Sequence, residues 1–153
     1  MYSGTLFLHS WLRWVVLALA VIAIVRAIAG RSSGRAFTAA DLASGRWYAI
    51  ALDIQVTIGL VLYFGFSSLL SMAMEDPGRA MATPTLRFWL VEHLVGMLAA
   101  VALAHIGLAR VRKAANDAAK WKAAVTFYSL SLLAMLLSLP WPGLAHARPL
   151  FRF

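Results

Sequence analysis

Residues 87–109, RFWLVEHLVGMLAAVALAHIGLA, decide the fold class of this chain. The run is long enough to cross a bilayer as a helix, because about 20 apolar residues are needed. It nevertheless carries three ionisable side chains, Glu92, His93 and His105. Such groups are costly at membrane depth, so they usually face the interior of a helical bundle, where they have a partner or a function.

Small residues share a helical face with His93 over the next four turns, at positions 96, 100, 104 and 107, with Met97 beside them. Small side chains allow another helix, or a flat ligand, to come close to the backbone. Two interpretations of His93 remain open. Either it is a metal ligand, with haem iron as the favoured metal and Gly96 as part of the cofactor seat, or it forms hydrogen bonds between helices together with Glu92.

Four apolar runs of the chain are long enough to span a membrane: 6–29, 47–71, 87–109 and 123–142. The chain has 153 residues, of which 62% are hydrophobic and 13% are charged, whereas a soluble domain is about half apolar. We therefore predict an all-α integral membrane four-helix bundle, with residues 1–153 forming a single transmembrane domain.

Positive charges gather in two of the three predicted connections, and the net charge of the chain is +8. The first connection carries or adjoins Arg26, Arg31, Arg35 and Arg46. The third carries Arg110, Arg112, Lys113, Lys120 and Lys122. Basic loops favour the cytoplasm. The distribution predicts periplasmic termini in a bacterial inner membrane, with the lipid bilayer rather than nucleic acid as the partner of the basic residues.

The choice of metal ligands is narrow, because the chain contains no cysteine and only four histidines. The absence of cysteine excludes disulfides, iron–sulfur clusters and thiolate ligation of haem. His9 and His93 each lie near the start of a predicted helix, and these two helices run in the same direction, so both residues fall in the outer half of the bundle. We predict that they are the axial ligands of one haem.

Four further polar residues lie inside the predicted spans. Arg13, one turn after His9, is either a counter-charge for a haem propionate or for Glu92, or an interfacial arginine that reaches the headgroups. Asp53, Gln55 and His105 lie in the inner half of the bundle, nearer the cytoplasmic boundary. We expect a buried hydrogen bond between Asp53 and His105, with a structural role favoured over a proton relay.

The outer connection carries three methionines, Met72, Met74 and Met81. Thioethers suit Cu(I), so this spacing suggests copper as an alternative metal, although methionine is also common at membrane interfaces. Common catalytic motifs are absent from the sequence. Any enzymatic role is therefore expected only as a component of a membrane oxidoreductase complex.

Four stretches, LHSWLRW at 8–14, IQVTIGLVLYF at 54–64, RFWLVEH at 87–93 and LPWP at 139–142, resemble those of a known family. Its members are small four-helix bacterial membrane proteins usually labelled cytochrome b, and the resemblance covers nearly the whole chain. It implies haem b and electron transfer, with His9 and His93 as ligands. It also implies Arg13, Gln55 and Glu92 as supporting groups. The family often has a histidine where this chain has Asp53.

Three functions are compared on this basis. The first is a haem b electron-transfer subunit that passes electrons between a quinone and a periplasmic partner. The second is a non-redox accessory subunit of a larger respiratory or photosynthetic membrane complex, and the third is a copper-handling membrane protein. In each case we expect the chain to assemble with a larger complex or with copies of itself.

Overall fold

The structure is a computed structural model that describes residues 1–151, and this part of the chain contains helices and no strand. The long helices are α1 (Tyr2–Ser33), α2 (Ala39–Val61), α6 (His93–Lys113) and α7 (Asp117–Leu137). Shorter elements join α2 to α6: the π-helical turns Leu62–Phe66 and Phe88–Glu92, and the helices α3 (Ser68–Glu75), α4 (Pro77–Ala82) and α5 (Pro84–Arg87). The predicted all-helical fold is confirmed.

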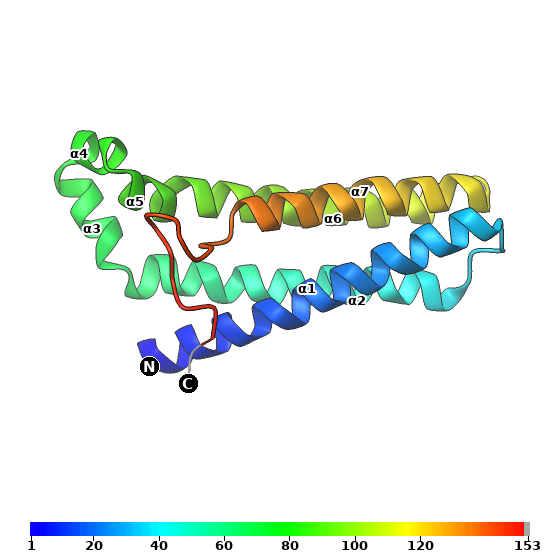
Figure 1. Ribbon diagram of the computed structural model, residues 1–153, viewed down its shortest axis with the longest axis horizontal. Helices are drawn as coiled ribbons and strands as arrows, with labels where there is room; N and C mark the ends of the chain where they lie inside the picture. Colours follow the sequence, from blue (N-terminus) through cyan, green and yellow to red (C-terminus); the bar gives the residue numbers. More distant parts are fainter. Residues whose placement is uncertain (152–153) are drawn as a thin grey trace.

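The long helices pack side by side in a closed ring, in which α1 contacts α2 and α7, and α6 contacts α7 and α2 (Figure 1). The start of α1 and the end of the described chain, called the chain termini below, lie at the end of the bundle that carries α3, α4 and α5 (Figure 1). The two short connections between long helices lie at the opposite end. The polar residues near the start of α1 and of α6 are therefore brought to the same end as the chain termini.

Three segments are long and apolar enough to cross a membrane: Tyr2–Ser33, Ala39–Phe66 and Pro84–Lys113. Helix α7 differs because Asp117, Lys120 and Lys122 occupy its first two turns and the helix ends at Leu137, before the predicted boundary at residue 142. Pro140 shortly afterwards cannot continue a helix. The fourth membrane crossing therefore stays a prediction.

The second helix begins at Ala39, eight positions before the predicted start at 47, because Thr38 and Asp41 form a capping box. The backbone N–H of Thr38 donates to the Asp41 carboxylate at 3.0 Å, and the Thr38 side chain accepts from the backbone N–H of Asp41. Asp41 also pairs with Arg26 at 2.7 Å and with Arg35 at 2.6 Å. The hydrogen bond with the Asp41 carboxylate raises the pKa of the Arg35 guanidinium.

The outer connection is more helical than expected. The predicted apolar run 47–71 is interrupted at Ser67, whose backbone is extended, and α3 begins directly after it. Pro77 and Pro84 occupy the first turns of α4 and α5, where the missing N–H costs no helical hydrogen bond. The prolines therefore start short helices here, and the expected loop 71–85 is largely helical.

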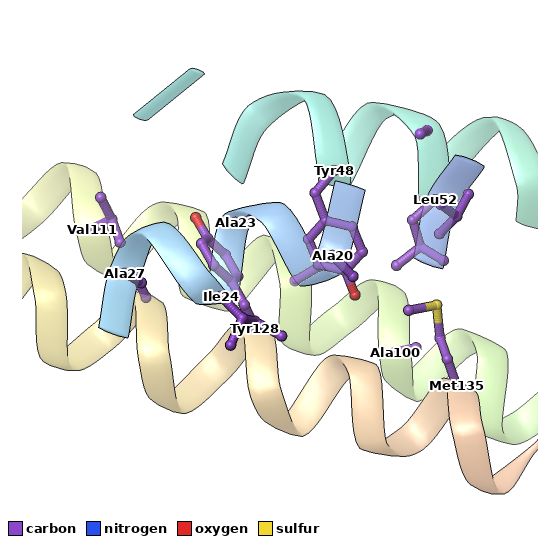
Figure 2. Packing of buried hydrophobic residues seen from close by; sticks show 14 of the residues in the cluster. Ala20, Ala23, Ile24, Ala27, Tyr48, Leu52, Ala100, Val111, Tyr128 and Met135 are labelled. Carbon is purple, nitrogen blue, oxygen red and sulfur yellow. The ribbon is translucent and has the colours of Figure 1, made fainter. Parts of the chain in front are cut away.

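The core is rich in alanine, and Figure 2 shows Ala20, Ala23 and Ala27 of α1 among larger side chains from the other helices. A polar chain crosses this core: the Tyr48 hydroxyl lies 2.6 Å from Ser131 Oγ, which donates to the carbonyl oxygen of Ala100 at 2.6 Å. Each of these buried polar groups has a partner, so this series of hydrogen bonds joins α2, α7 and α6.

The small residues that follow His93 on α6 pack against α7. Gly107 packs against Phe127 and Tyr128 of α7, and Ala100 and Ala104 are fully buried. Gly96 lies against Ser138, directly after α7. This face of α6 is therefore the α6–α7 packing surface. The small residues allow the close approach of another helix and not of a flat ligand.

Candidate functional site

A cavity of about 610 Å³ lies at the end of the bundle that holds the chain termini. Its lining comes from the four long helices, the start of α3, both π-helical turns and the segment after α7, and it includes His9, His93, Gln55 and Trp89. The volume falls within the range of about 300–1,000 Å³ that is usual for small-molecule and cofactor sites. The two histidines chosen from the sequence thus line one cavity from different helices.

The two π-helical turns stand next to each other at this cavity. The Tyr63 hydroxyl, on the first turn, donates to the carbonyl oxygen of Leu90, on the second, at 3.0 Å. The second turn leads directly into α6, where the backbone N–H of His93 bonds to the carbonyl oxygen of Phe88. Single π-helical turns often occur at functional sites, because they turn side chains away from the ordinary helical register.

The ring of His93 is held by one hydrogen bond, from Nδ1–H to the carbonyl oxygen of Ser138 at 2.7 Å. A carbonyl oxygen can only accept, so the proton of the neutral ring is on Nδ1 and the lone pair is on Nε2. The rings of Phe88 and Trp89 pack beside it, with centroids 5.9 Å and 5.4 Å away. His93 is therefore oriented as metal-binding histidines commonly are, with one nitrogen hydrogen-bonded and the other available.

His9 lies between α1 and α2, against Gln55 and Gly59. The amide nitrogen of Gln55 donates to the backbone carbonyl oxygen of His9 at 2.9 Å and lies 3.3 Å from its Nε2. A Cβ atom added to Gly59 would come within 3.1 Å of the His9 ring, so the ring sits where only glycine leaves space. Gln55 was expected in the inner half of the bundle, and its contact with His9 corrects that placement.

Three residues of the cavity lining each carry a buried polar atom that has no hydrogen-bond partner within the described residues: His9 Nδ1, Gln55 Oε1 and Trp89 Nε1. A buried polar group without a partner costs about 1–3 kcal/mol. A ligand or ordered water is the usual partner of such groups, so their concentration around one cavity marks it as the candidate binding site.

The charge of the cavity lining is positive. Arg13 from α1 and Arg148 from the C-terminal segment both line it, and none of the described lining residues is acidic. Nη2 of Arg13 donates to the carbonyl oxygen of Leu150, and the guanidinium of Arg148 lies 5.4 Å from the centroid of Trp89. The cavity is therefore suited to a mainly apolar ligand that carries acidic groups.

The segment after α7 forms part of the cavity wall, which no sequence pattern predicted. The carbonyl oxygen of Leu150 accepts hydrogen bonds from Arg13 and from Trp14 of α1, and the ring of Phe151 stacks on Trp14 at 5.1 Å. Closer to α6, His146 stacks on Phe88 at 3.5 Å. Backbone carbonyls and aromatic stacking leave no periodic pattern, so this contact could not be read from the sequence.

Two residues chosen from the sequence lie outside the cavity lining. Glu92 pairs with Arg87 at 2.6 Å, and both side chains are well exposed. Gly96 faces Ser138 across the α6–α7 packing surface. The methionines of the copper alternative lie on the short helices, Met72 and Met74 on α3 and Met81 on α4, and all three are exposed.

Asp53 and His105 form the predicted hydrogen bond. Nε2 of His105 lies 2.9 Å and 3.0 Å from the two carboxylate oxygens of Asp53, and the contact joins α2 to α6. The expectation that this pair is buried was wrong, because the side chains are 43% and 49% exposed on the outer surface of the bundle. Periodicity placed both residues at similar depth but could not tell which sides of α2 and α6 point outwards.

Within the described residues, no group of three or more histidine, cysteine or acidic side chains is arranged to hold a metal ion. In the comparisons with known proteins, no family model, no curated protein and no solved structure matches this chain.

Proposed function

We propose that this protein is a membrane haem b electron-transfer protein, with a single haem held by His9 and His93. The observation that carries the proposal is that these residues, from α1 and α6, line the same cavity of about 610 Å³. Two protein ligands suffice for a haem, because the macrocycle supplies the other four donors to the iron. A cluster of three or more ligating side chains is therefore not required.

The imidazole groups fit this role chemically. His93 has a lone pair on Nε2, because its Nδ1–H is bonded to Ser138. His9 has one buried nitrogen without a partner and a second at 3.3 Å from an amide, which is at the outer limit of a useful hydrogen bond. Both rings can thus offer a nitrogen to iron without breaking a strong hydrogen bond.

The remaining lining suits the acidic and apolar parts of the same cofactor. Arg13 and Arg148 would neutralise two carboxylate groups, and Leu94 and Met97 add apolar surface to the wall. Sequence analysis named only Arg13 for this role. Arg148 follows His146 in a short segment that carries no helical pattern, so its place in the wall was not foreseen.

A bound haem would supply one-electron redox chemistry at its iron. The protein's own contribution is to hold the imidazoles and to limit the access of water. The Ser138 carbonyl fixes the orientation of the His93 ring and increases the basicity of its ligating nitrogen. We expect a membrane quinone as electron donor or acceptor, since the protein has no large domain outside the helices among its described residues.

The proposal includes an orientation in a bacterial inner membrane. The basic connections lie at the end of the bundle opposite the chain termini, so the positive-inside rule assigns the cavity end to the periplasm. Single cysteines at Ser33, Asn116 and Pro77 would test it in intact cells. An impermeant maleimide should label the Pro77 position alone; labelling at Ser33 or Asn116 without Pro77 would reverse the orientation.

The absorption spectrum of the purified protein tests the function directly. The protein should be produced in haem-sufficient cells, extracted in mild detergent and examined in oxidised and reduced form. We expect the Soret and α bands of a low-spin haem b, with one haem per chain in a pyridine haemochrome assay. A preparation without a Soret band, or one with two haems per chain, would contradict the proposal.

A further inference from the structure

The pair formed by Asp53 and His105 lies on the outside of the bundle at a depth where lipid is expected. Asp53 is near the middle of the segment Ala39–Phe66, and it follows Arg46 by roughly 10 Å along the helix axis. His105 precedes Arg110 by roughly 8 Å on α6. Both side chains are nearly half exposed, so the polar contact is only partly covered by the chain itself.

This arrangement conflicts with the usual behaviour of ionisable groups in membranes. They are rare on surfaces that face lipid, and they normally point towards the bundle interior or towards a partner. The neighbouring surface is apolar: Ile50, Ile54 and Ile106 are exposed around the pair. The pair therefore needs a second surface that excludes lipid and supplies further hydrogen bonds.

The surface beside His105 is shaped for close contact with another helix. Ala102 lies one turn before His105 on α6 and Ala109 one turn after it, and both are exposed. Small residues at such positions let two helix backbones approach closely in a membrane. Unlike the small residues that face α7, these alanines have no helix of the same chain packed over them.

The hydrogen-bonding groups of the pair complement one another. The bond within the chain uses Nε2 of His105, and Nδ1 has no partner within the described residues. The Asp53 carboxylate can accept more bonds than it receives from one nitrogen. A second pair placed opposite would offer one imidazole nitrogen and one carboxylate in return, and two protonated imidazoles would alternate with two carboxylates in a closed ring.

A second copy of this chain supplies such an imidazole and carboxylate, because it carries the same Asp53–His105 pair. Copies inserted in the same orientation place Asp53 and His105 at the same depth. A two-fold axis along the membrane normal then sets each pair opposite its equivalent, as in an isologous interface. A partner of another sequence would need a matching pair at this depth.

We propose that the protein forms a symmetric dimer in which the α2–α6 surface of each copy, defined by Ile50, Asp53, Ala102, His105 and Ala109, covers the Asp53–His105 pair of the other. The His105 Nδ1 of one copy bonds to the Asp53 carboxylate of the other. The dimer does not depend on haem binding, since the α2–α6 surface lies apart from the cavity lining.

Disulfide cross-linking tests the dimer cleanly, because the chain has no native cysteine. Ile50→Cys and Ala102→Cys place thiols on the α2–α6 surface. Val25→Cys on α1 and Leu130→Cys on α7 are exposed controls on the opposite helices. After oxidation in native membranes, we expect a band of twice the monomer mass for the first two variants only. No such band, equal bands in the controls, or a band of another mass would overturn the proposal.

A charge exchange tests the role of the pair itself. Asp53→Asn should weaken association roughly tenfold when dimerisation is measured by fluorescence transfer in lipid vesicles at varied protein-to-lipid ratio. The double variant Asp53→His with His105→Asp keeps both groups at the interface, so it should restore association. If Asp53→Asn folds and associates as strongly as the original protein, or if the exchange variant folds and stays as weak as Asp53→Asn, the pair does not hold the dimer.

Discussion

Nδ1 of His93 lies 2.7 Å from the backbone carbonyl oxygen of Ser138, so a residue that follows α7 sets the orientation of a ring on α6. The contact uses a backbone atom, which a side-chain substitution at Ser138 does not remove. It leaves Nε2 as the nitrogen available to a ligand.

His93→Ala should abolish the low-spin haem spectrum, because it removes one of the two iron ligands that we propose. His105→Ala is the matched control: its ring bonds to Asp53 outside the cavity lining, so the spectrum should persist. The measurement is the Soret absorbance per chain after purification. If the band disappears with His105→Ala and survives in His93→Ala, the haem is held elsewhere.

Gly59→Ala should lower haem content while leaving the fold intact. The new Cβ would lie 3.1 Å from Cε1 of His9, so the ring must shift by a few tenths of an ångström. Alanine also favours the helix by up to about 1 kcal/mol over glycine, so lower haem binding without lower stability would separate the two effects. Gly59→Val should reduce haem content further.

Gly4→Ala is the control for this substitution. A Cβ atom at Gly4, also on a helix, has nothing within 4 Å. Haem content should therefore remain that of the original protein. Equal haem content in Gly59→Ala, Gly59→Val and Gly4→Ala would show that the His9 ring is not confined by α2.

Asp41→Asn should destabilise the protein by about 1.5–3 kcal/mol, because the carboxylate loses the charge that strengthens its hydrogen bonds with two arginines. Its side chain is 2% exposed, and it pairs with Arg26 and Arg35 as well as capping α2. The free energy of unfolding in mixed micelles measures the effect. Thr38→Ala, which removes only the cap, should cost about 1 kcal/mol. Similar losses for both would mean that the ion pairs contribute little.

The contact between the α1–α2 connection and the start of α7 should loosen in acid. The Asp117 carboxylate accepts from Lys120 Nζ and from the backbone N–H of Phe37, and these bonds lower the pKa of Asp117 below its usual range. A lowered pKa in the folded state means that the stabilising contribution is present above the unfolded pKa of about 4 and is lost as the pH falls through the folded value.

Hydrogen exchange at the Phe37 amide reports this contact. We expect its protection to decrease below about pH 4, beyond the intrinsic pH dependence of exchange. The variant Asp117→Asn cannot titrate, so its protection should not change over the same range. An identical profile in both proteins would assign the change to another group.

The sequence predicted the apolar helices better than their ends. Long hydrophobic runs fix the spans of α1, α2 and α6, because burial in lipid requires them regardless of local detail. Helix ends depend on individual side chains. Thr38 and Asp41 start α2 well before its apolar run begins, and Pro77 starts α4 within what was expected to be a loop.

The candidate site could be predicted only where depth alone decided the outcome. His9 and His93 were chosen for equal depth, and both line one cavity. The contact of Gln55 with His9 depends on how α1 and α2 cross, and the role of Arg148 depends on a segment without regular structure. Neither rotation of a helix about its axis nor the path of such a segment is encoded in hydrophobic periodicity.

The C-terminal wall of the cavity has a consequence for biogenesis. Pro140, Arg148 and Pro149 line the cavity, and Leu150 accepts hydrogen bonds from Arg13 and Trp14 at the start of the chain. This segment leaves the ribosome after all the long helices have been made. The cavity wall is therefore completed only by residues that are synthesised after α7, so the site cannot take its final shape while the long helices are still being made.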